Sequence, residues 1–365
     1  MTRRDLSWGA HLAAAEFDMA QLSQAGILAW ARRSAGLSWL LLALLAGGAR
    51  AEPTDHRPFA GTLMVATAAG QGKLPLRASA DWTLPMPEAI RALVVVPGAL
   101  RDADLSLRMA QASLYAAGDA GRGTRILVPQ FMAEPDMAAH GVPNDLLHWN
   151  ITGWIDGEAA TGPAPISSFE ALDAIVKRLA DPAVFPNLRR LVIAGHAGGG
   201  QLVQRYAVVG RGAAALTNAG GAVRYVVANA SSYLWFGEDR PVSTSRTACS
   251  AVDRWRYGLA QPPVYVEETE GLEERYIARD VVYLLGEADV DPNHPLLDKS
   301  CAAEAQGPNR YRRGMNYLFA LELRHPNLVR HRVVNVWGVG HDAASMFVSP
   351  CGLAVLFDRP GCTPF

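Results

Sequence analysis

A glycine-rich turn near the middle of the chain is the segment best suited to chemistry. The apolar run Leu191–Ala194 leads into Gly195-His196-Ala197, and three further glycines follow. A buried strand that turns sharply into a helix holds the side chain between them above the sheet, where the helix dipole stabilises a developing anion. Gly195 and Gly199 stand two residues to either side of Ala197, and small residues there let the backbone pass closely. The pattern predicts a nucleophile elbow with alanine at its centre and His196 supporting the turn.

A phosphate-binding loop is the alternative for these glycines, because a glycine-rich turn at a helix N-terminus also cradles anions. Such a loop needs Gly-Lys followed by serine or threonine, and no such tripeptide follows the glycines. The spacing of the dinucleotide-binding pattern G-x-G-x-x-G is not met either. The elbow is therefore the favoured interpretation.

A carboxylate and a histidine follow this elbow in the chain order that a nucleophile, acid and base require. Of the nine histidines, His341 alone combines this order with a place directly after a predicted strand. The segment after the preceding predicted strand offers Glu287, Asp289 and Asp291 as the acid, with Asp298 farther along. In such an arrangement the histidine moves protons and the acid orients its ring. The sequence predicts a triad of position 197, one of these carboxylates and His341.

A calcium loop is the rival interpretation of the acidic segment, since Asp289, Asp291, His294 and Asp298 lie close together in the chain. The EF-hand spacing and its glycine are absent from that segment. No metal and no cofactor is predicted.

Two backbone N–H groups are expected to stabilise the negative charge that develops during acyl transfer. Gly198 supplies the first, because it directly follows the elbow residue. The second is expected after an earlier strand, at Ala99 or Leu100 of the segment Pro97-Gly98-Ala99-Leu100.

These motifs resemble the α/β-hydrolase superfamily over residues 60 to 350. The elbow is similar to the superfamily form Gly-His-Ser-x-Gly-Gly, with Ala197 in place of the serine. Within the superfamily the chain looks like exported, poorly characterised bacterial members. It departs from the common pattern at Pro97-Gly98, where His-Gly is usual. The resemblance implies an α/β-hydrolase fold and a serine-type hydrolase mechanism. It also implies Asp289 as the acid, because this residue holds the superfamily's G-x-x-D position, with Asp291 as the runner-up and Glu287 and Asp298 behind them.

Apolar, β-branched runs alternate with helical patterns over the same residues, which is typical of a mostly parallel, doubly wound sheet with helices on both faces. Segments around Gly61–Thr67 and Leu76–Trp82 are expected to pair as antiparallel strands at the sheet edge. The remaining predicted strands are Ala92–Val96, Arg125–Val128, Arg190–Ala194, Val223–Ala228, Val281–Leu285 and Arg332–Val336.

Two further segments bear on the site. Ser167 and Glu170 form a capping-box pattern at the start of a helix that Asp181-Pro182 ends, directly before the strand of the elbow. Residues 231–279 are irregular and rich in tryptophan, tyrosine and proline. An insertion at this point of a doubly wound sheet lies above the carboxyl ends of the strands, so it is predicted to be a cap over the site. A purely structural excursion is the alternative.

The net charge of −1 and the 19% of charged residues argue against nucleic acid and polyanionic partners, which require clustered lysine and arginine. A small-molecule or polymeric ester is the expected partner, and the oligomeric state is left open. Half of the residues are hydrophobic, which is ample for one large core.

The first residues are predicted to be a targeting segment. Arg32-Arg33 precedes the apolar run Leu37–Ala46, and Ala49-Arg50-Ala51 supplies the small residues of a signal-peptidase site. We expect cleavage after residue 51, leaving residues 52–365 as one domain that is periplasmic or secreted. A membrane anchor is the alternative, and membrane contact is expected only if this run is retained.

All four cysteines, Cys249, Cys301, Cys351 and Cys362, lie in the C-terminal part of the chain. An even number in an exported chain predicts two disulfides, with three possible connectivities. Pairing of Cys351 with Cys362 closes a short loop, and Cys249 with Cys301 then ties the cap to a later loop. Four free thiols are the alternative.

Ala197 has no group that attacks a carbonyl, so the chain is expected to bind substrate without turning it over. The favoured hypothesis is an esterase-like serine hydrolase in which alanine replaces serine through engineering. A natural, non-catalytic binding protein is the alternative. Peptidase, lactonase and polyester depolymerase action on the same triad stay open, because a fold and a triad do not fix the substrate.

Overall fold

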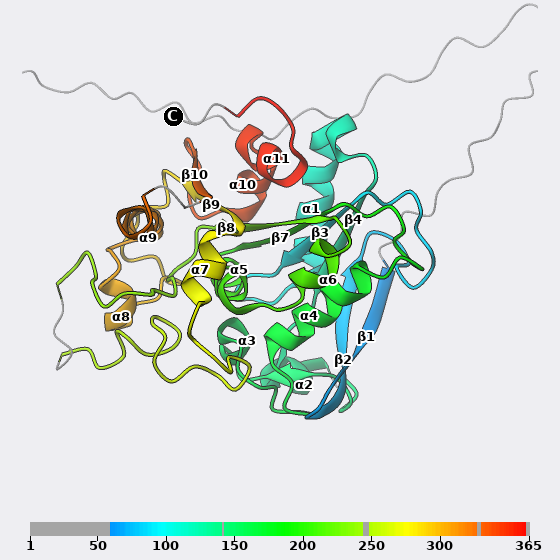
Figure 1. Ribbon diagram of the computed structural model, residues 1–365, viewed down its shortest axis with the longest axis horizontal. Helices are drawn as coiled ribbons and strands as arrows, with labels where there is room; N and C mark the ends of the chain where they lie inside the picture. The colour runs from blue at the N-terminus through cyan, green and yellow to red at the C-terminus, as the bar shows by residue number, and fades with distance from the viewer. Residues whose placement is uncertain (1–58, 141, 244–247, 327–329, 363–365) are drawn as a thin grey trace, which may run out of the picture. The chain divides into compact units, whose positions relative to one another are not determined.

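The computed structural model describes residues 59–362, apart from 141, 244–247 and 327–329 (Figure 1). The predicted targeting segment, residues 1–51, lies outside the described residues. Among the residues that are described, no helix is both long enough and apolar enough to cross a membrane.

An eight-stranded sheet forms the centre of the described chain, with the order β1-β2-β4-β3-β7-β8-β9-β10. The strands from β4 to β10 in this order pair in parallel, while β1 and β2 form an antiparallel hairpin and β2 pairs antiparallel with β4. The strands of the sheet are β1 (Phe59–Thr67), β2 (Gly70–Ala78), β3 (Arg91–Val96), β4 (Thr124–Pro129), β7 (Arg190–His196), β8 (Ala222–Ala228), β9 (Asp280–Gly286) and β10 (His331–Val336). The short strands β5 (Met132–Ala133) and β6 (His148–Trp149) pair separately.

Six predicted strands are confirmed as β3, β4, β7, β8, β9 and β10. The prediction of an edge strand at Leu76–Trp82 was wrong in its bounds, because β2 covers Gly70–Ala78. The turn before β2 is made by two alanines and is followed by Gly70 at a φ of +131°, and β2 contains Pro75. Alanines do not signal a turn and proline argues against a strand, so both local signals pointed away from the hairpin.

Helices cover both faces of the sheet (Figure 1). α1, α10 and α11 pack on one face, and α4, α5, α6, α7 and α9 pack on the other. The helices are α1 (Ala103–Ala117), the 3₁₀ helix η1 (Gly118–Gly121), α2 (Glu134–His140), α3 (Gly153–Asp156), α4 (Ser168–Leu179), α5 (Gly198–Val209), α6 (Ala213–Thr217), α7 (Leu272–Ile277), α8 (Cys301–Glu304), α9 (Arg310–Arg324), α10 (Ala343–Val348) and α11 (Pro350–Phe357).

The two cores alternate along each central strand. In β3, Leu93 and Val95 face the α1 side, while Ala92, Val94 and Val96 face the α4 and α5 side, and all five are buried. A strand that is buried on both faces reads as a continuous apolar run, which is why these strands were recognisable in the sequence.

The helix before the elbow starts as predicted. Ser167 accepts a hydrogen bond from the Phe169 amide, and Glu170 accepts one from the Ser167 amide at 2.7 Å. This capping box satisfies N–H groups that the first turn of a helix leaves unpaired. α4 ends at Leu179 and leads towards β7, the strand that carries the elbow.

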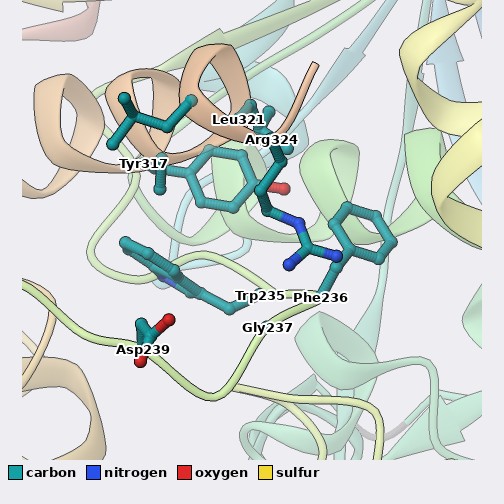
Figure 2. Close-up of a pocket in the computed structure, with 9 residues that line it drawn as sticks. Trp235, Phe236, Gly237, Asp239, Tyr317, Leu321 and Arg324 are labelled. Atoms are coloured by element: carbon teal, nitrogen blue, oxygen red, sulfur yellow. The ribbon is translucent and has the colours of Figure 1, made fainter.

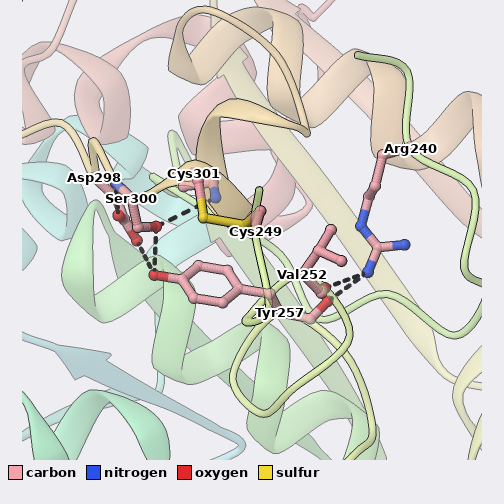
Figure 3. The surroundings of a disulfide bond; sticks show 8 residues. Arg240, Cys249, Val252, Tyr257, Asp298, Ser300 and Cys301 are labelled. Carbon is pink, nitrogen blue, oxygen red and sulfur yellow. Dashed lines mark hydrogen bonds between the residues drawn. A yellow bond between two sulfur atoms is a disulfide. The ribbon is translucent and has the colours of Figure 1, made fainter. Parts of the chain in front are cut away.

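Residues 229–271 form the long connection between β8 and α7, in the region predicted as a cap. A disulfide joins Cys249 in this connection to Cys301 at the start of α8 (Figure 3). Close to it, the hydroxyl of Tyr257 donates to Asp298 Oδ2 at 2.7 Å (Figure 3). The second disulfide, Cys351–Cys362, ties α11 to the segment that follows it, so the structure has two disulfides with one of the three possible connectivities.

Candidate active site

The turn between β7 and α5 has the strained backbone that an elbow requires. Ala197 adopts φ +54° and ψ −115° as the N-cap of α5. Its amide donates to the carbonyl of Ala228 in the neighbouring strand at 3.0 Å, and its carbonyl accepts from the Gln201 amide at 3.0 Å. Positive φ disfavours residues that carry a Cβ, so the surrounding structure must hold this position in place.

The glycines of the turn are required by close backbone contacts. A Cβ on Gly195 would overlap the carbonyl of Gly199, and a Cβ on Gly199 would overlap the carbonyl of Val96. The elbow therefore packs directly on the carboxyl end of β3. The prediction that Gly195 and Gly199 permit a close passage agrees with these contacts.

Two backbone amides meet beside the elbow. A Cβ on Gly198 would lie 3.1 Å from the amide nitrogen of Ala99, so the segment after β3 lies against the start of α5. Within the described residues, neither the Gly198 amide nor the Ala99 amide donates a hydrogen bond. Leu100, the alternative donor, is 76% exposed and lies one residue farther along.

His341 and Asp289 are brought together by the ends of two neighbouring strands. His341 follows β10 and Asp289 follows β9, and the distance from His341 Nδ1 to Asp289 Oδ2 is 2.8 Å. Burial alone would raise the pKa of Asp289, but the hydrogen bond from His341 and the charges of His341 and Arg310 outweigh it and lower that pKa. The Asp289 side chain is only 2% exposed, so this carboxylate is a buried anion with a fixed partner.

Arg310, the first residue of α9, contacts the other oxygen of the same carboxylate. Its Nη1 lies 3.5 Å from Asp289 Oδ1, and its Nε donates to Ser231 Oγ at 3.0 Å. The guanidinium is fully buried. A buried carboxylate is stable as an anion only when it is paired, and Arg310 and His341 together provide that pairing.

Asn229 connects the two loops that carry the acid and the histidine. It follows β8 directly, has a φ of +41° and is fully buried. Its side-chain nitrogen donates to the carbonyl of Gly340 at 3.1 Å, and its oxygen accepts from the Gly286 amide at 2.9 Å. Because Gly340 directly precedes His341, the hydrogen bond from Asn229 fixes the position of the loop that carries this histidine.

Three imidazole rings lie in a row at this edge of the sheet. The ring of His341 lies between those of His196 and His294, with centroid separations of 4.6 and 4.7 Å. Burial, with a smaller contribution from the charge of His341, lowers the pKa of His196 to about 3. His196 is therefore neutral near pH 7, and its ring, next to position 197 in the chain, contacts that of His341.

The other carboxylates considered for the acid lie in different surroundings. Asp291 is exposed and accepts the amide of Asn293. Asp298 accepts hydrogen bonds from Tyr257 and from the Ser300 amide, and it forms an ion pair with Arg256. Among the described residues, no group of three or more metal-ligating side chains is placed to hold an ion.

The aromatic residues of the connection between β8 and α7 are turned inward. Tyr233, Trp235, Tyr257 and Tyr265 are each at most 6% exposed. They pack against the hydrophobic clusters, so the region predicted to be a cap does not present these aromatic side chains to a substrate.

Two cavities lie near elements of the site. A pocket of about 130 Å³ is lined by Trp235, Phe236 and Tyr317 and by the end of α9 (Figure 2). Arg324 at its rim is paired with both oxygens of Glu273. A larger groove, of about 800 Å³, includes Leu100 in its lining and so adjoins the paired amides.

Sequence reasoning missed Asn229 and Arg310. Asn229 directly follows the strand that ends at Ala228, just as Ala197 directly follows the strand of the elbow. This position at the end of a strand was a usable signal. Arg310 begins α9, which contains four arginines, and nothing in the sequence distinguishes it from the others.

The sheet order, the strained turn after β7 and the acid and histidine loops after β9 and β10 together define an α/β-hydrolase fold. No protein-family model matches the chain, and no curated protein sequence matches it. Solved structures share its fold. The poly(aspartic acid) hydrolase-1 of Sphingomonas sp. KT-1 superposes with a TM-score of 0.54 at 21% identity, over 79% of this chain and 96% of that one. The poly(3-hydroxybutyrate) depolymerase LpqC of Bordetella parapertussis gives 0.55 at 19% identity, over 83% and 92%.

Proposed function

We propose that this site is that of a serine-type carboxylic-ester hydrolase whose nucleophile position is occupied by Ala197. The observation that carries the proposal is the 2.8 Å contact between His341 and the buried Asp289, beside an elbow with positive φ. A buried carboxylate fixes the tautomer of the histidine and stabilises the imidazolium that forms during acyl transfer. The names of the two fold neighbours, a polymer hydrolase and a polyester depolymerase, agree with an ester or a related carbonyl substrate.

With serine at position 197, the mechanism proceeds in two steps. The hydroxyl oxygen attacks the ester carbonyl while Nε2 of His341 accepts its proton, and Nδ1–H donates to Asp289. The amides of Gly198 and Ala99 then stabilise the oxyanion, with Leu100 as the alternative donor. His341 returns the proton to the departing alcohol, which leaves an acyl-enzyme. Water, deprotonated by the same histidine, releases the acid and regenerates the hydroxyl.

The chain with Ala197 keeps the surroundings of this reaction and lacks the attacking atom. Loss of a nucleophile from such a triad lowers turnover by about 10⁶-fold, while substrate binding and the oxyanion donors survive. The chain as it stands is therefore proposed to bind an ester without hydrolysing it. An engineered serine-to-alanine replacement accounts for a site that is otherwise complete.

Restoring the nucleophile tests the proposal. Ala197→Ser is assayed on p-nitrophenyl esters of several acyl lengths, beside the unchanged chain and a double variant that also carries His341→Ala. We expect hydrolysis by Ala197→Ser that is lost in the double variant, because the serine depends on the histidine for activation. If Ala197→Ser matches the unchanged chain on every ester, the esterase proposal is wrong.

A natural binding protein is the second candidate, and the observation that favours it is Ala197 itself. It predicts that an ester or its product acid raises the thermal midpoint of the unchanged chain, because a ligand that binds only the folded state stabilises it. It also predicts no gain of hydrolysis in Ala197→Ser. Peptidase, lactonase and polyester depolymerase activity are tested by the same variant with amide, lactone and polyester substrates.

We further propose that the protein is exported. Two disulfides support this, because such bonds persist in oxidising compartments. Mass spectrometry of the N-terminus of protein recovered from the periplasm or the medium tests it, and retention of residues 37–46 in a membrane fraction contradicts it.

A further inference from the structure

We propose that a groove beside the segment after β3 binds an extended, uncharged part of the substrate, beyond the ester that reacts. We call it the hairpin groove. Its volume is about 800 Å³, and its lining includes Thr62, Arg77, Leu100, Arg101, Met132 and Val142. That volume lies within the range of ligand sites, roughly 300–1,000 Å³. The inference rests on the proposed function, because the groove is placed relative to the proposed oxyanion donors.

The hairpin groove begins one residue from a proposed oxyanion donor. Leu100 and Arg101 directly follow Ala99, whose amide lies beside Gly198. On the opposite wall the hairpin β1–β2 pairs with the carboxyl end of β4, since Leu76 is in register with Pro129. The groove therefore lies at the same edge of the sheet as the elbow. A long substrate whose carbonyl oxygen contacts the two amides is therefore proposed to extend past Leu100 into this groove.

The wall nearest the site is held rigidly. Arg101 has a φ of +56° and donates to both oxygens of Asp136, at 2.6 and 2.9 Å. It also donates to the carbonyl of Ala99 at 2.9 Å, and its own carbonyl accepts from the side chain of Gln130. Because this wall is already ordered, the protein loses less conformational entropy there when a ligand binds. The same contacts keep the Ala99 segment against the elbow.

The charges of the hairpin groove favour an uncharged ligand. Its lining contains two arginines and three aspartates. Arg77 pairs with Asp104 at 2.7 Å, and Arg101 pairs with Asp136. Both cations are thus neutralised by acids of the groove itself, and Asp102 adds a further negative charge. A polyanion needs unneutralised basic side chains, whereas Leu100, Met132 and Val142 offer apolar contact.

The test measures binding by the chain as it stands, so that it does not depend on turnover. The probe is a soluble linear oligomer of 3-hydroxybutyrate whose terminal carboxyl is blocked as a methyl ester, which makes it an uncharged oligoester, and its dissociation constant is measured by calorimetry. Thr62→Trp fills the groove from β1, and we expect it to weaken binding by about tenfold or more, the range for one steric mismatch in a pocket. Val142→Trp narrows the groove from another wall and should act in the same direction.

Met64→Trp is the matched control. Met64 lies two residues beyond Thr62 on the same face of β1, is 49% exposed and is not part of the groove lining. It should leave the dissociation constant unchanged, and thermal midpoints of all three variants verify folding. Poly(aspartic acid) serves as the anionic probe and is expected to bind more weakly than the oligoester.

The two proposals fail in different ways. The groove inference is overturned if the oligoester does not bind, if both groove-filling variants bind it as the unchanged chain does, or if poly(aspartic acid) binds more tightly. If Ala197→Ser hydrolyses p-nitrophenyl esters and Thr62→Trp in that background leaves oligoester hydrolysis intact, the proposed function holds and the groove inference is wrong. If oligoester binding depends on Thr62 while Ala197→Ser hydrolyses nothing, the groove inference holds and the esterase proposal is wrong.

Discussion

Nη1 of Arg310 lies 3.5 Å from Oδ1 of Asp289, the carboxylate oxygen that His341 does not contact. The acid is thus held between a permanent cation and an imidazole in a site closed to solvent. A cation in this place disfavours any further positive charge on the neighbouring rings. The positive charge of Arg310 therefore helps to lower the pKa of Asp289.

Replacement of Arg310 tests this dependence in the Ala197→Ser background. The charged and titratable groups around His341 are Asp289, His294, His196, Asp342 and Arg310. Arg310→Gln removes a positive charge beside Asp289, so the pKa of Asp289 rises. We expect the acidic limb of the kcat/KM profile to move up by about one pH unit, as for other neighbouring charges.

Arg313→Gln is the matched control for Arg310→Gln. Arg313 is also buried on α9, but it donates to the carbonyls of Ser231, Asp298 and Gly307 and not to Asp289. We expect Arg313→Gln to lower stability and leave the pH profile in place. If both variants lose stability with no change in the profile, Arg310 has only a structural role.

The choice between the two leading acids is tested by a pair of substitutions in the Ala197→Ser background. Asp289→Asn should lower kcat by about 10⁴-fold, because an amide favours the wrong histidine tautomer. Asp291→Asn should leave kcat unchanged, because Asp291 is exposed and contacts only the nearby turn. A larger loss with Asp291→Asn than with Asp289→Asn contradicts the assignment.

Asn229→Asp separates the two hydrogen bonds of Asn229. The aspartate keeps an acceptor for the Gly286 amide and loses the donor to the Gly340 carbonyl. Two facing oxygens then repel each other, so the loop that carries His341 moves. In the Ala197→Ser background we expect kcat to fall by about 10² with a smaller change in KM, as for misplaced catalytic groups. An unchanged kcat means that the histidine loop does not rely on this contact.

Position 197 is expected to respond to glycine with a gain in stability. Ala197 holds a φ of +54°, which costs an L-residue roughly 1 kcal/mol and costs glycine little. Ala197→Gly should therefore raise the free energy of unfolding by about 1 kcal/mol in urea titrations. Ala194→Gly, in the buried strand before the turn, should lower it. A loss of stability in Ala197→Gly contradicts the inferred strain.

Two buried histidines predict a loss of stability in mild acid. Burial lowers the pKa of His196 to about 3 and that of His331 to about 4, whereas the ordinary value is 6.5. Below pH 6.5 the unfolded chain binds protons that the folded chain does not, so stability falls as the pH falls towards 4. Each histidine contributes roughly 1.4 kcal/mol per pH unit in that range.

His331→Gln checks the second of these contributions. Nδ1 of His331 lies 2.9 Å from the Tyr283 hydroxyl, and Nε2 lies 2.9 Å from the Tyr276 carbonyl. Burial lowers the pKa of His331 to about 4, so the ring is neutral near pH 7. Glutamine does not titrate, so the free energy of unfolding, measured in urea at pH 6 and at pH 5, should fall less between these two pH values in the variant than in the unchanged chain. An equal fall in the two proteins contradicts the pKa assigned to His331.

The strands and the elbow were predictable because their signals are local. An apolar run such as Leu191–Ala194 is buried on both faces of the sheet. The glycines near Ala197 lie so close to neighbouring backbone that a side chain would not fit there. Chain order then led to Asp289 and His341. These features depend on neighbouring residues or on the order of strands, and both are legible in a single sequence.

The contacts that support the site were not predictable, because they join distant segments. Arg310 contacts Asp289, which is 21 positions away in the sequence, and Asn229 contacts Gly340, which is 111 positions away. The antiparallel pairing of the two edge strands was predicted, but the start of β2 at Gly70 was not, since the turn residues before it are alanines. The burial of side chains in the region predicted as a cap was also not predictable from the sequence, and its aromatic residues Tyr233, Trp235, Tyr257 and Tyr265 are buried.

The disulfide between Cys249 and Cys301 closes a covalent ring, with the two cysteines 52 positions apart. β9 and Asp289 lie within this ring, while β7, the elbow and His341 lie outside it. The disulfide thus tethers the segment that carries Asp289 to the connection after β8. Reducing agents in a refolding or purification buffer act on the half of the machinery that carries the acid. The redox history of a preparation therefore belongs among the conditions recorded with any measurement of its activity.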